Sequence, residues 1–160
     1  YYSRYGPTFD QRVEDTEVDL KFTIGEYNFR GIIDRLDQPE PGKWIVHDYK
    51  TSKRPKTERQ AMNDIQLALY QIAVEQNFGQ VEEISLTWHF LRIGSEVTVL
   101  HTRDELEKLR KKLIKSADKI NNCLGNEINF LPKESILCHW CYLWEECTAK
   151  VGPNPVKRAD

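Results

Sequence analysis

Polar and apolar residues alternate along residues 17–24, which predicts a half-buried β-strand because successive side chains of a strand point to opposite faces. A turn at Gly25-Glu26 leads into an apolar run from Phe29 to Leu36. Pro and Gly residues within 38–42 separate that run from another, Trp44 to Tyr49. Apolar runs punctuated in this way predict three consecutive strands joined by two tight turns.

Helical spacing replaces this alternation further along the chain. A capping box at Thr57 opens a pattern in which apolar residues recur at helical intervals as far as Asn77, which predicts one helix. Another capping box at Thr102 predicts a helix from Asp104 to Asn122. Its core face would consist of Leu106, Leu109, Leu113, Ala117 and Ile120.

Two further strands are predicted between the helices, at Ile84 to Leu91 and at Glu96 to His101. His89 and His101 lie in or beside them, and we interpret both as packed or hydrogen-bonded residues rather than ligands. Alternating strands and helices within 160 residues indicate one α/β domain that can bury a core.

The composition is that of a globular protein, with 39% hydrophobic and 30% charged residues. No apolar run is long enough to cross a bilayer and the N-terminus does not resemble a signal peptide, so we expect a cytoplasmic protein without membrane association. The formal net charge of −2 argues against a nucleic-acid binder driven by charge alone. A protein that holds metal ions at its site partly escapes this objection, because the ions add positive charge there.

Acidic residues interrupt the second and third predicted strands. If their hairpin is centred near Pro41, the numbers of paired residues sum to about 82, which places Asp34 roughly opposite Asp48. Two like charges repel there, and a divalent cation between them would keep both ionised; carboxylates suit Mg²⁺ and Mn²⁺. Lys50 follows Asp48 by two positions and shares its face of the strand. Two carboxylates and an ammonium are therefore predicted to converge on one metal site.

A third acid is predicted from the first hairpin. With the turn at Gly25-Glu26 as its centre, the numbers of paired residues sum to about 51, so Glu17 falls opposite Asp34. Glu17 is therefore a candidate catalytic residue and metal ligand. A solvated strand face would also explain an acidic residue at this position.

Three motifs carry a resemblance to a known family. They are Gly31-Ile-Ile-Asp34-Arg35-Leu-Asp37, then Asp48-Tyr49-Lys50-Thr51, then Gln66-Leu-Ala-Leu-Tyr70. In this order and spacing they resemble the PD-(D/E)XK nuclease superfamily, and in detail its RecB-type branch, over roughly residues 14–147. The resemblance implies a restriction-endonuclease-like core, with a mixed, mainly antiparallel central sheet of about five strands flanked by helices.

The resemblance also implies an enzyme, a metal-dependent DNA nuclease with exonuclease activity that acts in DNA repair, recombination or CRISPR adaptation. One or two Mg²⁺ or Mn²⁺ ions would activate water and stabilise charge on the phosphate. Their ligands would be the carboxylates of Asp34 and Asp48, the backbone carbonyl of Tyr49 and the carboxylate of Glu17.

Basic and polar residues complete the implied catalytic site. Lys50 would orient the attacking water and offset charge on the scissile phosphate. The resemblance implies that Gln66 and Tyr70, four residues apart on one side of a helix, position Lys50 or the nucleic-acid backbone. The loop after Lys50 would bind DNA phosphates through Lys53, Arg54 and Lys56, although an ordinary surface loop explains these residues nearly as well.

All four cysteines, Cys123, Cys138, Cys141 and Cys147, lie in the last quarter of the chain. Without secretory features, such clustering favours metal ligation over disulfides. The spacing of the last three resembles the C-terminal part of the iron–sulfur staple in one group of RecB-type nucleases. Thiolates in such a run suit an iron–sulfur cluster or, alternatively, Zn²⁺, in a structural role.

The fourth ligand of this staple is open. In the group that the sequence resembles, it is a cysteine upstream of the first acidic residue, where this sequence has none. Either it lies in an N-terminal segment ahead of residue 1, or Cys123 or His139 takes its place. The start without Met leads us to expect such a missing segment. We predict a nuclease domain over residues 1–147, which includes the staple at 123–147, and a tail at 148–160.

A different class of function was weighed against catalysis. The chain could be a catalytically silent, nuclease-like module that binds DNA or serves as a scaffold in a helicase-nuclease or CRISPR complex. Such a module would bind no metal at Asp34 and Asp48. The complete set of acidic, basic and amide residues favours the enzyme. The expected partners are DNA and either a helicase domain or CRISPR integration proteins.

Overall fold

The computed structural model describes residues 6, 13–124, 130, 132, 134–147 and 149. It divides into two compact units, Tyr1–Asp118 and Lys119–Asp160, and each is described by itself. The first unit holds the sheet and the candidate active site. The predicted tail at 148–160 lies outside the described residues, apart from residue 149.

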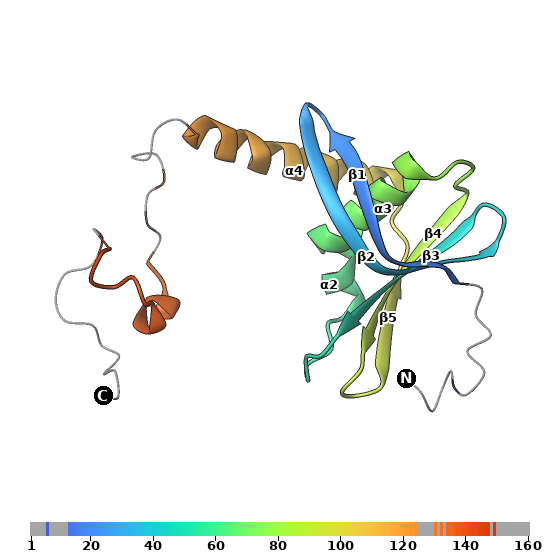
Figure 1. The fold of residues 1–160 in the computed structure, drawn as a ribbon, viewed down its shortest axis with the longest axis horizontal. Helices are drawn as coiled ribbons and strands as arrows, with labels where there is room; N and C mark the ends of the chain where they lie inside the picture. Colours follow the sequence, from blue (N-terminus) through green and yellow to red (C-terminus); the bar gives the residue numbers. More distant parts are fainter. Residues whose placement is uncertain are drawn as a thin grey trace. The chain divides into compact units, whose positions relative to one another are not determined.

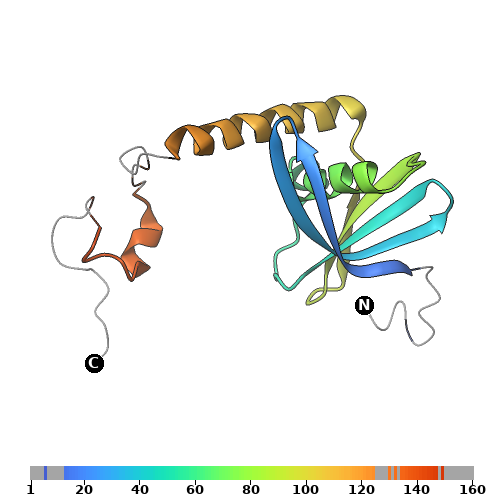
Figure 2. The same ribbon diagram turned by 45° about the horizontal axis from the view of Figure 1, so that its top comes forward.

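Five strands form one sheet in the order of the sequence, as Figures 1 and 2 show. Each strand is antiparallel to its neighbour except the third and fourth, which are parallel. The mixed, mainly antiparallel sheet of the prediction is therefore confirmed. The strands are β1 (Val13–Ile24), β2 (Tyr27–Glu40), β3 (Lys43–Lys50), β4 (Glu83–Phe90) and β5 (Ser95–Val99).

The two hairpins have the predicted registers. Thr16 pairs with Arg35 and Val18 with Ile33, so the residue numbers sum to 51 across β1 and β2. Arg35 also pairs with His47, so the numbers sum to 82 across β2 and β3. The first hairpin keeps its register up to the tight turn at Gly25-Glu26, because a short turn leaves little freedom in which residues face each other, whereas the second changes register between Asp37 and Glu40.

The helix predicted from Thr57 to Asn77 is in fact two helices, α2 (Glu58–Met62) and α3 (Ile65–Asn77). Thr57 caps α2 with the predicted capping box. The chain then turns, and the Asp64 carboxylate accepts the amide hydrogens of Gln66 and Leu67 to start α3. A side chain that satisfies these free amides favours a new helix start over continuation of the old helix.

Helix α3 lies against the sheet at β1, β2 and β4 and supplies much of the core. Seven of its residues are buried, including Leu67, Ile72 and Val74. At its C-terminal end the Gln76 amide both donates to the Thr23 carbonyl and accepts from the Thr23 amide. These bonds fix α3 to the outer edge of β1 and so fix where the start of the helix meets the sheet.

Helix α4 (Arg103–Cys123) begins at the predicted capping box, where the Glu105 carboxylate accepts the Thr102 amide hydrogen. Leu106, Leu109 and Leu113 are buried as predicted. The apolar face predicted to continue to Ile120 does not, because Ile120 is 58% exposed. Ile120 belongs to the second unit of the structure, whereas Leu106, Leu109 and Leu113 belong to the first. Within the described residues, every helix is too short or too polar to traverse a bilayer.

Candidate active site

The two aspartates lie on neighbouring strands where β2 meets β3. Asp34 Oδ2 accepts a hydrogen bond of 2.9 Å from the backbone amide of Tyr49, so the carboxylate of β2 is tied to β3. Asp48 is 2% exposed and sits beside Trp88, its partner in the parallel pairing with β4. The structure therefore places one half-buried and one buried carboxylate side by side, as predicted from the register.

Lys50 forms an ion pair with Asp48, with 2.6 Å between Nζ and Asp48 Oδ2. Within the described residues, Asp48 Oδ2 is a buried oxygen with no hydrogen-bond donor other than the Lys50 ammonium. Burial raises the pKa of Asp48; Lys50 opposes this rise and the charge of Asp34 adds to it. A second positive charge beside Asp48 would therefore stabilise its ionised form.

Gln66 and Tyr70 reach the site from the first turns of α3. Lys50 Nζ donates to Gln66 Oε1 at 2.9 Å, and Gln66 Nε2 donates to the Tyr70 hydroxyl, also at 2.9 Å. Burial, followed by the nearby charge of Asp48, raises the pKa of Tyr70 to about 12. Tyr70 therefore keeps its proton at neutral pH and remains a hydrogen-bond donor.

The start of α3 is held by Asp64, which the sequence analysis missed. Its Oδ1 accepts the amide of Gln66, and its Oδ2 lies 3.0 Å from Lys56 Nζ. The Lys56 ammonium also lies over the Trp88 ring, 4.4 Å from the ring centroid. Asp64 thus links the loop after β3 to the helix that carries Gln66. An Asp directly before an apolar helical run is a recognised N-cap signal and could have revealed it.

The arrangement of strands, helix and site agrees with the comparison against protein-family models. The model of the PD-(D/E)XK nuclease superfamily matches residues 2–148. The chain belongs to this superfamily. Among curated protein sequences, no match to the chain was found.

The comparison with solved structures found similar chains. The crystal structure of SSO0001 is 20% identical to the chain, with a TM-score of 0.50, and the alignment covers 86% of the chain and 61% of SSO0001. A protein described as a "putative exonuclease" from Eubacterium rectale is 17% identical, with a TM-score of 0.46 and coverage of 76% of the chain and 54% of that protein. The chain therefore spans less than two thirds of the length of either structure.

The residues present fit the divalent metal that PD-(D/E)XK nucleases use. Carboxylate oxygens are the donors that Mg²⁺ and Mn²⁺ prefer. Asp48 Oδ2 is buried with the Lys50 ammonium as its cationic neighbour, and the charge of Asp34 acts on the Asp48 carboxyl. Two carboxylates that repel each other in a poorly solvated place are stabilised by a cation between them. Asp34 and Asp48 are thus the candidate ligands on chemical grounds.

Glu17 takes the predicted position opposite Asp34 in the register but does not join the two aspartates. Its backbone has a φ of 51°, in the left-handed region, and its side chain is exposed. A left-handed residue interrupts the regular alternation of side chains along a strand. Within the described ranges, no three His, Cys, Asp or Glu side chains group so that they could hold a metal ion.

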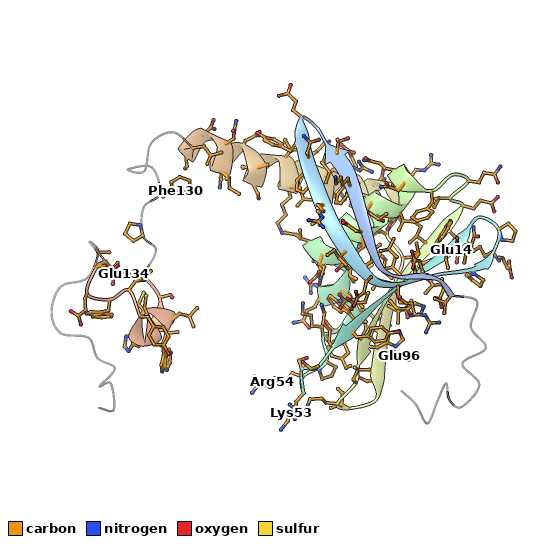
Figure 3. All side chains as sticks on the ribbon, viewed as in Figure 1. Glu14, Lys53, Arg54, Glu96, Phe130 and Glu134 are labelled. Atoms are coloured by element: carbon orange, nitrogen blue, oxygen red, sulfur yellow. The ribbon has the colours of Figure 1, made fainter. Side chains whose placement is uncertain are left out.

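The basic residues of the loop after β3 have different surroundings. Lys53 and Arg54 lie on the exposed turn of this loop, as Figure 3 shows. Lys56 is instead engaged by Asp64 and Trp88, as described above. The exposed Lys53 and Arg54 could contact phosphate groups directly. Lys56 would first have to leave Asp64 or share it with the phosphate.

The four cysteines are not brought together. Among the residues that the structure describes, none of them belongs to a group of three possible metal ligands. Cys138 instead lies in the 3-10 helix η2 (Ile136–Trp140), where its sulfur accepts the amide hydrogen of Ser135 at 3.4 Å. The residues as placed therefore do not fit an iron–sulfur cluster or a zinc ion, and the staple stays a prediction.

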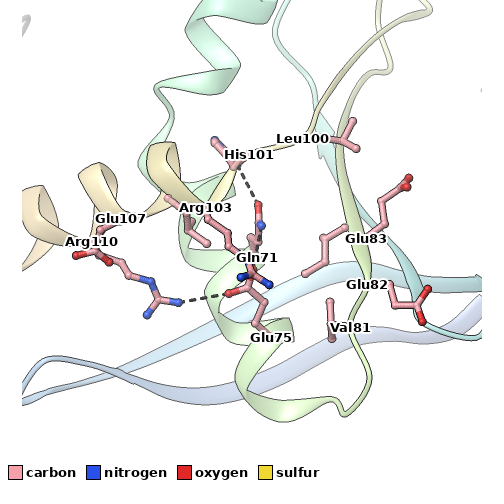
Figure 4. A pocket seen from close by; sticks show the side chains of 12 residues that line it. Gln71, Glu75, Val81, Glu82, Glu83, Leu100, His101, Arg103, Glu107 and Arg110 are labelled. Atoms are coloured by element: carbon pink, nitrogen blue, oxygen red, sulfur yellow. Dashed lines mark hydrogen bonds and ion pairs between the residues drawn. The ribbon is translucent and has the colours of Figure 1, made fainter.

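A pocket of about 560 Å³ lies between α3, β4 and the start of α4 (Figure 4). His101 Nδ1 lies 3.2 Å from Gln71 Oε1, and Arg110 Nη2 lies 3.3 Å from Glu75 Oε2. His101 is thus hydrogen-bonded and buried, as predicted. These four polar side chains of the pocket are thus engaged in pairs, and the residues that line it lie outside the candidate active site.

Proposed function

We propose that the chain is a metal-dependent nuclease that hydrolyses phosphodiester bonds of DNA, with exonuclease activity. The observation that carries the proposal is the continuous set of contacts from Asp34 and Asp48 through Lys50 to Gln66 and Tyr70. Two strands and a helix contribute to this set, and the core alone gives no reason for a buried carboxylate, an ammonium and an amide to meet there.

In the proposed reaction Asp34, Asp48 and the Tyr49 carbonyl hold Mg²⁺ or Mn²⁺. The bound ion would lower the pKa of a water molecule and stabilise charge that develops on the phosphate. Lys50 would orient the water and offset the charge of the phosphate. Gln66 fixes the Lys50 ammonium through its carbonyl oxygen, and Tyr70 fixes the Gln66 amide in turn.

Superfamily membership supports DNA as the substrate, and the exposed Lys53 and Arg54 beside the site support a role in phosphate binding. We further propose the RecB-type branch, a role in DNA repair, recombination or CRISPR adaptation, a cytoplasmic location, and a helicase or CRISPR integration partner. These finer proposals rest on the sequence motifs alone. The iron–sulfur or zinc staple joins them on the spacing of the cysteines, without support from their placement.

Linear and covalently closed circular DNA test the proposal together. We expect wild-type protein to degrade end-labelled linear DNA with Mn²⁺ or Mg²⁺ and to leave it intact with EDTA. Closed circles should resist, because an exonuclease needs an end. Cleavage of circles at the same rate would contradict the exonuclease assignment, and an Asp48→Asn protein with wild-type cleavage would contradict the site.

A further inference from the structure

A chain of side-chain contacts crosses strands β2 to β5 beside the candidate active site. Arg35 donates two hydrogen bonds to Asp37, one of them 2.7 Å from Nε to Oδ1. Asp37 Oδ2 lies 3.1 Å from His47 Nε2, and His47 Nδ1 lies 2.7 Å from His89 Nε2. His89 Nδ1 lies 2.9 Å from Glu96 Oε1, and Figure 3 labels Glu96. We call these five residues the polar chain.

The polar chain lies in the interior of the protein, where an unpaired charge is costly. Arg35, Asp37 and His89 are all less than one-tenth exposed, at 7%, 4% and 2%. Burial raises the pKa of Asp37, but hydrogen bonds from His47 and Arg35 outweigh burial and lower it overall. Asp37 is therefore ionised at neutral pH and holds its two partners in one orientation.

Members of the polar chain alternate with the active-site aspartates along both strands. Arg35 follows Asp34 in β2, and His47 precedes Asp48 in β3. Arg35 and His47 are cross-strand partners. The register that pairs them on their side of the strands is the register that sets Asp34 opposite Asp48.

This register needs a specific device, because polar residues occupy both sides of the strands here. A slip of one residue would turn every side chain of β3 to the other side. Hydrophobic alternation normally prevents such slips, whereas here a slip would break the contact between Asp37 of β2 and His47 of β3. Tyr49 connects the polar chain to the site: its backbone amide donates to Asp34, and its ring stacks on the His89 ring with centroids 5.1 Å apart.

We propose that the polar chain is a positioning network that fixes the spacing of Asp34 and Asp48 and thereby sets the affinity of the site for a divalent metal. The inference rests on the proposed function, because it concerns the metal of that site. The five residues act through the backbones of β2 and β3. Outer hydrogen-bond partners of metal ligands typically change metal affinity or activity by about 10- to 100-fold.

Four variants test the network against a general loss of stability. His89→Phe keeps a ring for Tyr49 but removes both hydrogen bonds, and His89→Gln returns a donor toward His47. Glu96→Leu breaks the last bond at the edge strand, where the side chain is 21% exposed and the fold tolerates change. Thr87→Val is the control, because it removes the 2.9 Å contact with Thr98 between the same two strands and, although Thr87 pairs with His47 in the sheet, keeps the hydrogen-bonding side chains of the polar chain.

Calorimetry with Mn²⁺ alone, without DNA, gives the deciding dissociation constants, and thermal unfolding without metal gives stability. We expect His89→Phe and Glu96→Leu to weaken Mn²⁺ binding by about 10-fold or more, with partial recovery in His89→Gln. Thr87→Val should lower the unfolding temperature but keep the Mn²⁺ constant within about twofold of wild type. In cleavage assays kcat should fall in the two broken variants while KM for DNA stays unchanged.

The outcomes separate this inference from the proposed function. If wild type binds Mn²⁺ and Glu96→Leu binds it equally well, the positioning role is wrong and the nuclease proposal stands. If Thr87→Val weakens Mn²⁺ binding as much as His89→Phe, the effect is one of stability alone and the positioning role is again wrong. Wild type that binds no Mn²⁺ would overturn both proposals together.

Discussion

Lys50 is the residue on which the contacts of the candidate site meet. Its ammonium lies between the Asp48 carboxylate, at 2.6 Å, and the Gln66 amide oxygen, at 2.9 Å. A flexible lysine side chain held from two sides loses its freedom before the substrate arrives, which is the condition for efficient positioning. A metal ion bound to Asp48 would compete with Lys50 for this carboxylate. The contact between Lys50 and the Gln66 amide is therefore as important as the ion pair with Asp48.

Gln66→Met therefore removes the contact that holds Lys50 when metal occupies the aspartates. We expect kcat to fall by about 10- to 100-fold, with KM for DNA and the unfolding temperature almost unchanged, because Gln66 is exposed. Single-turnover cleavage with Mn²⁺ measures the effect. Tyr70→Phe is the companion variant, and a smaller loss is expected because it leaves the Lys50 to Gln66 bond intact. A Gln66→Met protein with wild-type kcat would contradict the role of the amide.

Asp37 gives a prediction on stability at the same scale. Its pKa is lowered in the folded protein, so its contribution is complete above the unfolded value of about 3.9 and is lost as pH falls through the lower folded value. Asp37→Asn leaves Arg35 buried without its counter-charge, which should cost about 3 to 5 kcal/mol at neutral pH. Urea unfolding at neutral pH and below about pH 3.5 should show this difference shrink in acid. A difference independent of pH would contradict the ionised Asp37.

At the scale of elements, the break between α2 and α3 sets where Gln66 and Tyr70 face the strands. Asp64 starts α3 two residues before Gln66 and binds Lys56 from the preceding loop. Had one helix run through this region, the positions of both residues would depend on α2 instead. The cap is therefore part of how the site is built.

Asp64→Ala removes this cap and should cost about 1 kcal/mol of folding free energy. Because it also releases Lys56 and loosens the first turn of α3, we expect cleavage to fall by more than the stability loss explains. Thr102→Ala is the matched control, because Thr102 caps α4 with the same type of contact and its hydrogen-bond partner, Glu105, lies outside the site. Thermal unfolding and cleavage rates should show similar stability losses in both variants but an activity loss in Asp64→Ala alone. Equal activities would contradict the role of the cap.

Much of this element-level arrangement was accessible from the sequence, for identifiable reasons. The register of the first hairpin follows from its short turn, and a count from the centre of the second turn predicted that Asp34 lies near Asp48, with Lys50 on the same face as Asp48. The helix break was missed because the apolar period runs through Asn63 and Asp64 without interruption. The N-cap signal at Asp64 was therefore overlooked, because the apolar spacing on both sides of it indicated one continuous helix.

The polar chain escaped sequence analysis for a different reason. His47 meets His89 across the parallel pair of β3 and β4, and two helices separate those strands in sequence. A turn cannot set the register of two strands that are joined through helices. The sequence therefore did not show that His89 lies opposite Tyr49 and next to His47. His89 was correctly interpreted as a hydrogen-bonded strand residue, without its partners. The left-handed backbone of Glu17 was equally invisible, because nothing in a Thr-Glu-Val sequence requires it.

At the scale of the whole molecule, the superfamily match and the sheet describe a nuclease core within a chain of net charge −2. If a core with this balance binds DNA, it would depend on local charge, and the exposed Lys53 and Arg54 follow Lys50 in the same loop. The chain spans 61% of the length of SSO0001, so partners and pathway belong to the proposals. The proposed partners and pathway both depend on nuclease activity of this core.

The most direct test is cleavage of end-labelled DNA by wild type, Lys50→Ala and Lys53→Ala in Mn²⁺ and in EDTA. We predict metal-dependent degradation by wild type, loss of at least about 100-fold in kcat for Lys50→Ala, and only a raised KM for Lys53→Ala. Circular dichroism of all three proteins checks that they are folded. A folded Lys50→Ala protein that degrades DNA at the wild-type rate, or a folded wild type with no cleavage in Mn²⁺, would contradict the proposed active site.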